Sequence, residues 1–368
     1  MCGDQPHQPE DGHDRGHHHE HGGVLLPDSL ITRRHAIRVG GMGLGAALLA
    51  ACTGAKRLGA PTTDSSLVIP TTDMAASTVA TPTTTTVEDT ADPMSVPEAF
   101  APFADTVKVD RSGKWWLVEC NRMPAHNMMV GITSWQQQVP TPQPYTGANA
   151  WSIPVTPVLS QTPQSAKTSL YRGAIALAVN GVPIFNALNN RGDDAYLAGE
   201  LDEWGGHAGR ADDYHYHIAP LHLQGKVGAH KPIAYALDGF PIYGEVEPNG
   251  SKVTGLDELN GHHWSDGSYH YHGTRTFPYI NGGLRGVITV SGDQVEPQPM
   301  TRPFREAGTP LRGGVITSFD SSTKNSFRLG YSVNGASAEV EYVVGASSVS
   351  FTFTDASGAV RRETYARR

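Results

Sequence analysis

The sequence predicts a mostly β protein, an internally duplicated β-rich domain with few short helices followed by a small C-terminal β-meander. Three observations predict this class. Short apolar or β-branched runs bounded by Gly, Pro and Asn recur along the chain, and long helical periodicity is absent. The middle of the chain repeats the same motifs in the same order. Its C-terminal part alternates apolar and polar residues between tight turns.

Length and composition narrow the function classes. The chain has 368 residues, enough for one large or two modest domains. A formal net charge of -8 argues against a nucleic-acid partner. Three cysteines cannot build a disulfide-stapled scaffold, and no apolar run reaches the roughly 20 residues of a membrane-spanning helix. Histidine stands out, with 17 residues.

The N-terminal region has the pattern of an export signal. Arg33 and Arg34 precede a weakly apolar Gly/Ala-rich run, residues 39–51, and Cys52 follows Leu-Ala-Ala at its end. This order resembles a twin-arginine signal that ends in a bacterial lipobox. The alternative is a buried Gly/Ala helix. We expect residues 1–51, with seven of the histidines, to be removed after export.

The export signal predicts a place and two partners for the mature chain. Cys52 would be acylated and inserted in the lipid bilayer after passage through the export translocon. Residues 52–97 are rich in Thr, Ser, Pro and Ala, and such a segment cannot bury enough apolar area to offset its ordering entropy. We therefore expect a disordered tether holding the domain at the outer face of the cytoplasmic membrane or in the cell envelope.

The predicted strands of the globular part are short. Residues 310–368 read as the β-meander, with about four strands separated by turns such as Asn334-Gly335. The predicted strands are 114–119, 174–179, 286–290, 327–333, 338–344, 348–354 and 359–365.

The duplication covers about residues 174–217 and 232–272. The last two of three shared blocks are offset by 55 residues and the first by 58, so the second copy has lost three residues in a connecting loop. We infer two similar halves about a pseudo-twofold axis. The blocks begin at Asn180, Leu201 and Tyr214 in the first copy and at Asp238, Leu256 and Tyr269 in the second.

The duplicated histidines are candidate metal ligands. Alternate residues of a strand share a face, so His215 and His217 point one way and the neighbouring tyrosines the other. The same holds for His270 and His272, and each pair has a Gly-His unit eight residues upstream. These imidazoles form either one site on the axis or two three-histidine sites, unless they are structural and bonded individually. The candidate ligands are His207, His215, His217, His262, His270 and His272.

The sequence allows more than one role for the other polar residues near the histidines. The carboxylates are ligands, general bases or acceptors that fix a histidine tautomer, or else they lie in solvated turns. Asp238 is charged in an apolar setting and is a further candidate to face the site. The arginines bind an anion or form surface ion pairs, and the unrepeated histidines are assigned to surface or packing roles. The carboxylates are Asp202, Glu203, Asp257 and Glu258; the arginines are Arg210, Arg275 and Arg285; the histidines are His126, His222, His230 and His263.

The doubled Tyr-His-Tyr-His, with Asp-Gly-Phe-Pro-Ile-Tyr and Asp-x-x-x-Gly-His, resembles the YHYH protein family over about residues 105–292. We therefore expect a YHYH domain over residues 98–295. The resemblance implies a secreted or surface protein but no settled activity. Relatives tend to carry a cysteine where this chain has Trp204 and Leu259. If those cysteines bridge the halves, Trp204 and Leu259 replace a disulfide and should touch, which leaves an N/O metal site.

Two functions from different classes follow. The leading interpretation is an exported lipoprotein that binds Cu or Zn, since imidazole ligands favour these metals over Mg or Ca. It is either a metal-binding protein or a metalloenzyme, hydrolytic with Zn and oxidative with Cu. The alternative is a non-catalytic module whose aromatic residues bind a glycan or peptide while the histidines pack in the core. Trp115, Trp116, Tyr214 and Tyr269 are its candidate aromatic residues.

Overall fold

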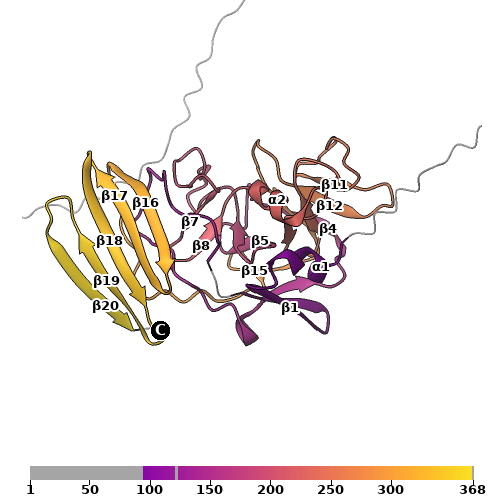
Figure 1. The fold of residues 1–368 in the computed structure, drawn as a ribbon. Helices are drawn as coiled ribbons and strands as arrows, with labels where there is room; N and C mark the ends of the chain where they lie inside the picture. The colour runs from indigo at the N-terminus through magenta and orange to yellow at the C-terminus, as the bar shows by residue number, and fades with distance from the viewer. Residues whose placement is uncertain (1–93, 121–122, 367–368) are drawn as a thin grey trace, which may run out of the picture. The chain divides into compact units, whose positions relative to one another are not determined.

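The computed structural model describes residues 94–120 and 123–366 (Figure 1). The predicted signal arginines, the lipid-attachment cysteine and most of the tether lie outside these residues. The first described element, α1 (Val96–Phe100), is capped by Ser95 and Glu98 and begins inside the predicted tether. No helix among the described residues is long and apolar enough to cross a membrane.

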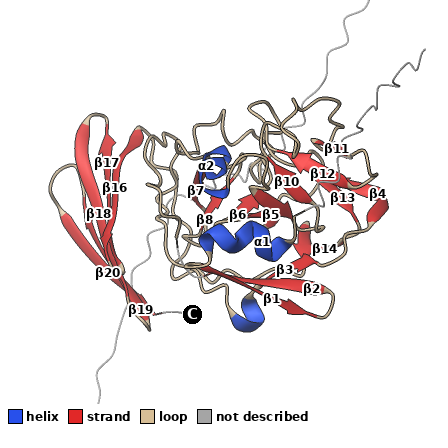
Figure 2. Cartoon of the chain, turned by 45° about the vertical axis from the view of Figure 1, so that its right-hand side comes forward, coloured by secondary structure: helices blue, strands red, loops and turns tan. Residues whose placement is uncertain are grey.

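Strands dominate the described chain, which confirms the mostly β prediction (Figure 2). The helices are short: α1, α2 (Gln224–Val227) and three single 3-10 turns at Ala101–Phe103, Gly147–Asn149 and Leu221–Leu223. Three small sheets accompany the central one. They contain β1 (Val107–Ser112), β2 (Trp115–Cys120) and β3 (Trp151–Pro154); β4 (Leu159–Ser165) with β13 (Gly283–Gly286); and β14 (Thr289–Ser291) with β15 (Gln294–Glu296).

An eight-stranded sheet contains both copies of the repeat. Its order is β11-β12-β10-β9-β5-β6-β8-β7, so the strands of the first copy mirror those of the second about the β5–β9 pair. The strands are β5 (Ala174–Ala178), β6 (Pro183–Phe185), β7 (Gly206–Ala208), β8 (Tyr214–Tyr216), β9 (Ala234–Ala236), β10 (Pro241–Tyr243), β11 (Gly261–His263) and β12 (Tyr269–His272).

The register of β5 and β9 places the pseudo-twofold axis. These strands are antiparallel, and Leu177 pairs with Tyr235, its own counterpart 58 residues later. On either side, Ala176 pairs with Ala236 and Ala178 with Ala234, as a twofold rotation requires. The predicted duplication and its axis are therefore confirmed.

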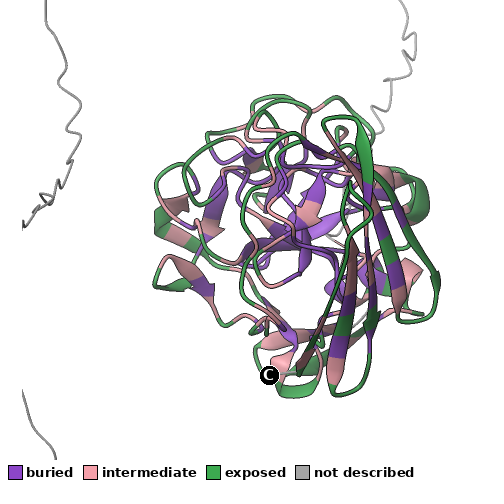
Figure 3. Cartoon of the chain, turned by 90° about the vertical axis from the view of Figure 1, so that its left-hand side faces the viewer, coloured by how far each residue is buried: buried purple, intermediate pink, exposed green. Residues whose placement is uncertain are grey.

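The centre of this sheet is the most buried part of the domain. All five residues of β5 and all three of β9 are buried, and Figure 3 shows buried segments concentrated on the central strands. Alanines at the axis let neighbouring layers approach closely. Burial of both faces explains why β5 is a continuous apolar run rather than an alternating one.

The C-terminal sheet has five strands where the sequence predicted about four. The additional strand is β16 (Gly314–Thr323), whose register shifts after Ile316 interrupt the alternation that marks the other strands. Asn334 and Gly335 both have positive φ, as a two-residue hairpin turn requires. The other strands are β17 (Ser326–Val333), β18 (Ala336–Val344), β19 (Ser348–Thr354) and β20 (Val360–Ala366).

The predicted contact between Trp204 and Leu259 is wrong. Each residue precedes an edge strand, and these strands, β7 and β11, lie at opposite ends of the eight-stranded order. Trp204 stacks against the His126 ring, whereas Leu259 lies beside Gly283. The pseudo-twofold axis separates the two positions, so a disulfide there could not bridge the halves.

The Gly-His units need glycine because two strands approach closely there. A Cβ on Gly261 would lie 2.2 Å from the Tyr269 hydroxyl and 2.7 Å from the His270 carbonyl oxygen. We expect Gly261→Ala to lower the free energy of unfolding by about 1–3 kcal/mol, the usual range for overpacking. Gly225→Ala is the matched control, because no atom lies within 4 Å of its added Cβ. Equal urea midpoints for the two variants would contradict this account.

Candidate metal centres

Three histidines converge at the β7–β8 edge of the sheet. His207 on β7 pairs with His215 on β8, and His217 follows on the same face. The Nε2 atom of His217 lies 3.1 Å from the Nε2 atoms of both His207 and His215. His215 and His217 are buried. We call these three residues the first triad.

Backbone carbonyls set the orientation of the first triad. His215 Nδ1 lies 3.0 Å from the Asp213 carbonyl oxygen, and His217 Nδ1 lies 2.6 Å from that of Asn186. The Glu200 carbonyl accepts a hydrogen bond from the His207 ring. A carbonyl oxygen only accepts, so Nδ1 of His215 and of His217 carries the proton, and each neutral ring then has a bare lone pair on Nε2.

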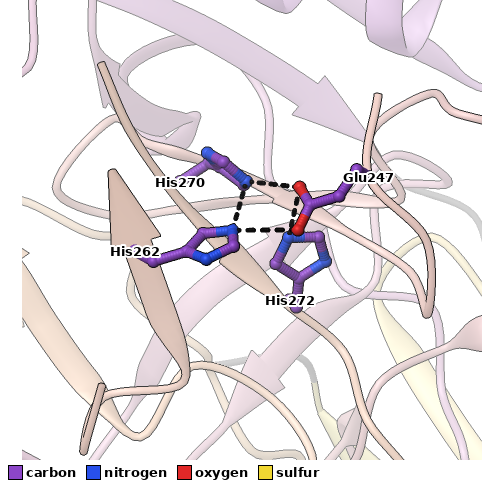
Figure 4. A group of neighbouring side chains, drawn as sticks. All are labelled: Glu247, His262, His270 and His272. Atoms are coloured by element: carbon purple, nitrogen blue, oxygen red, sulfur yellow. Dashed lines mark hydrogen bonds and ion pairs between the residues drawn. The ribbon is translucent and has the colours of Figure 1, made fainter. Parts of the chain in front are cut away.

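The opposite edge carries a second triad, His262, His270 and His272, together with a carboxylate (Figure 4). The Nε2 atoms of His262 and His270 are 3.0 Å apart. Glu247 Oε1 lies 3.1 Å from His262 Nε2, and its Oε2 lies 3.2 Å from His270 Nε2 and 3.3 Å from His272 Nε2. This group therefore offers three nitrogens and a carboxylate.

The same carbonyl contacts recur in the second triad. His262 Nδ1 donates to the Thr254 carbonyl at 2.9 Å, and His272 Nδ1 donates to that of Gly244 at 2.8 Å. Gly244 is the counterpart of Asn186 at the 58-residue offset. Because the acceptor is a backbone carbonyl, the side chain at that position changes without loss of the contact. The duplication has thus preserved the tautomer of His217 and His272 as well as the histidines themselves.

These arrangements match the needs of a metal ion. Bare lone pairs that face one another at 3.1 Å, as in the first triad, repel unless a cation lies between them. Two nitrogens each 2.0–2.1 Å from one ion lie about 3.3 Å apart at a tetrahedral angle, close to the observed spacing. His272 Nε2 is buried without a hydrogen-bond partner. All ligand atoms within each group lie within 4.8 Å of one another.

Burial favours the neutral form of the buried rings His215 and His270. It lowers the pKa of His215, and the neighbouring His207 and His217 lower it further. It also lowers the pKa of His270 to about 4. A neutral imidazole presents the lone pair that a metal needs, whereas an imidazolium does not.

Glu247 was not among the residues singled out from the sequence. Its counterpart at the 58-residue offset is Asn189, so the repeat does not mark it as a shared residue. Both residues begin equivalent turns, flanked by the bridges Leu188–Asp194 and Val246–Lys252. Extending the repeat past the Pro-Ile-aromatic block would have exposed this Asn-to-Glu difference.

The predicted carboxylates lie away from both triads. Asp202 accepts hydrogen bonds from the Trp204 and Gly206 amides and from the Tyr214 hydroxyl at 2.7 Å. Asp257 plays the same part for the Tyr269 hydroxyl at 2.8 Å. They shape the turn before each Gly-His unit and bind the tyrosine face of the sheet. Glu203, Asp257 and Glu258 are exposed, as in a solvated turn, whereas Asp202 is buried.

The structure also shows the contacts of Asp238 and the positions of the three candidate arginines. Asp238 is buried but accepts from the Tyr271 hydroxyl at 2.6 Å and from the Gly286 amide, on the tyrosine face. Arg275 pairs with exposed Glu245, and Arg285 donates to the Ser160 carbonyl. Arg210 alone among the three arginines lines a cavity beside a triad.

Two histidines without repeat counterparts pack on the tyrosine face. His126 Nε2 lies 2.6 Å from the Tyr216 hydroxyl, and its ring stacks on Trp204 at 4.9 Å. His222 meets both rings edge-on. The packing role therefore describes them. His230 and His263 make ring contacts to the carbonyls of Pro248 and Gly267.

The first triad opens onto a cavity of about 930 Å³. All three of its histidines line this space. Polar and charged side chains from other segments do so as well, among them Asn189, Arg191, Glu200, Arg210 and Asp213. The first triad is thus buried in the sheet yet accessible to a small molecule.

Part of the chain is similar to a known protein family. Residues 150–251 match the model of the YHYH protein family. The chain carries a YHYH domain. The matched segment contains the first triad and Glu247 and ends before β11, so it is shorter than the predicted resemblance. Searches of curated proteins and of solved structures found no match.

The packed histidines make the stability of the YHYH domain depend on pH. Burial lowers the pKa of His222 from 6.5 to about 4. Below pH 6.5 the unfolded chain therefore binds a proton that the folded chain does not, and stability falls as the pH drops toward 4. We expect His222→Gln to lessen this fall, measured by urea unfolding of the metal-free protein between pH 7 and pH 5. An unchanged pH dependence would contradict the assignment.

Proposed function

We propose that this protein is an exported lipoprotein that binds a transition metal at two sites, one in each half of its YHYH domain. The observation that carries the proposal is the convergence of Nε2 lone pairs within each triad. The first site would use His207, His215 and His217, and the second His262, His270, His272 and Glu247. The two triads lie at opposite edges of one sheet, which favours two sites over one shared site.

The ligand atoms of the two sites narrow the choice of metal. Imidazole suits Zn, Cu, Fe and Ni, and sets of three imidazoles without thiolate, joined by one carboxylate in the second site, favour Cu or Zn over Mg or Ca. Bound Zn would supply a Lewis acid and an activated water for hydrolysis. Bound Cu would supply a redox couple for oxidation. The chain's own contribution is the fixed tautomers and a partly dry pocket.

The contacts disfavour the alternative of a non-catalytic module with structural histidines. Histidines bonded individually would direct each Nε2 to its own partner, whereas the triad rings direct their Nε2 atoms at one another. Tyr214 and Tyr269, proposed there as ligand-binding aromatics, are buried and bonded to Asp202 and Asp257. They are therefore not free to line a cleft.

Metal content tests the central proposal. Metal-loaded protein should hold two ions per chain by mass spectrometry. Changing the first triad to Ala should remove one, changing the second should remove the other, and changing both should remove both. His263→Ala is the matched control, because His263 is adjacent to the second triad but exposed and outside it.

Three results would contradict the two-site proposal. Wild-type protein that stays folded and takes up neither Cu nor Zn would refute metal binding. A single ion lost equally from either triad variant would indicate one shared site. Loss of metal in His263→Ala would show that the effect is not specific to the triads.

Export and anchoring follow from the signal-like N-terminus. We expect Cys52→Ser to move the protein from the membrane fraction to the soluble fraction and to abolish labelling by a radioactive fatty acid. Replacing Arg33 and Arg34 with Lys should leave the precursor inside the cell, because the twin-arginine route depends on this pair. Unchanged membrane association of Cys52→Ser would contradict lipid anchoring.

A further inference from the structure

The two halves differ in the residue beside each triad that could supply a fourth metal ligand. In the second half Glu247 brings both carboxylate oxygens within 3.1–3.3 Å of the histidine Nε2 atoms. In the first half the equivalent residue is Asn189, which has no carboxylate to offer and whose side-chain amide bonds Glu200 instead. The protein therefore completes one donor set and leaves the other at three imidazoles.

Asn189 is engaged elsewhere. Its Nδ2 donates to Glu200 Oε1 at 3.1 Å. Its Oδ1 accepts from the backbone amides of Arg191 and Asp193. The backbone of this turn matches that of Glu247, with an i to i+4 amide bond in each. The exchange of Glu for Asn thus changes the donor set while keeping the turn.

Several charged side chains near the first triad have neutral counterparts in the second half. Glu200 is buried, pairs with Arg191, and lies in the loop that is three residues longer than its counterpart. Arg210 and Asp213 line the cavity, and their counterparts at the 55-residue offset are both serines. The two copies thus differ in the charged residues around their triads.

Arg210 is the side chain in this set suited to a ligand. It is exposed, lies on the turn between β7 and β8, and shares the cavity with the first triad. The other three have partners: Arg191 pairs with Glu200, and Asp213 accepts a hydrogen bond from the Ala211 amide. A guanidinium near a divalent cation is a pair that binds an oxyanion, one oxygen at the metal and another at the arginine.

We propose that the first triad is an open centre that takes a small oxyanion, a carboxylate or phosphate group, as its fourth ligand from the cavity. Arg210 binds the same anion, and Glu247 closes the second centre to it. This inference rests on the proposed metal binding. It assigns the two centres different roles, with exchangeable ligands at the first and a complete donor set at the second.

Cobalt reports on this difference directly. Protein loaded with Co²⁺ is first assayed for metal content, and then acetate and inorganic phosphate are titrated in separate arms while the visible d–d absorption is recorded. A variant lacking the second triad should respond as strongly as wild type, and one lacking the first should not respond. Arg210→Ser, which copies the equivalent residue Ser265, should weaken anion binding about tenfold, or about 1.4 kcal/mol, without loss of metal.

Glu247→Asn provides the reciprocal test. It copies the first-half residue into the second half, so the second centre should gain an anion response while keeping its ion. Equal responses of both wild-type centres, or no response from the first centre with metal bound, would overturn the inference. Failure to bind any Co²⁺ would instead refute the proposed metal sites, and the metal assay separates the two failures.

Discussion

A hydrogen bond from an imidazole Nδ1 to a backbone carbonyl, made by two histidines of each triad, is the interaction on which both sites depend. It selects the ring tautomer, fixes the ring plane, and leaves the Nε2 lone pair pointing at its neighbours. Because the acceptors belong to the main chain, as at Asn186 and Gly244, side chains around them have changed without disturbing the geometry. Burial then disfavours the protonated rings that would otherwise relieve the repulsion.

The pseudo-twofold symmetry of the sheet places these hydrogen bonds in two separate sites, one in each half. Pairing of Leu177 with Tyr235 at the centre puts each Gly-His hairpin at an outer edge, so the triads form within halves rather than between them. The alternating strands also divide the chemistry. Histidines take one face, while the tyrosines on the other face bind Asp202, Asp257 and Asp238. The duplication thereby supplies two similar scaffolds that can diverge separately.

Much of this arrangement followed from the sequence, because it depends on short-range spacing. The His-x-His pairs and the Gly-His units predicted the six histidines that converge, and the repeat predicted the axis. Glu247 was missed because it differs between the copies, and β16 was missed because a register shift breaks its alternation. The predicted contact between Trp204 and Leu259 was wrong because equivalent residues of two repeats touch only when they lie close to the twofold axis. The repeat in the sequence does not show that distance. Asp202 and Asp257 were open candidates because spacing cannot tell a turn acceptor from a site carboxylate.

The most direct test is a crystal structure of protein loaded with Cu or Zn, with anomalous diffraction recorded on both sides of the metal edge. The account predicts two separate peaks. One should lie among the Nε2 atoms of His207, His215 and His217 with a non-protein fourth ligand, and the other among His262, His270, His272 and Glu247. A well-ordered domain without either peak, or one peak shared between the halves, would contradict it.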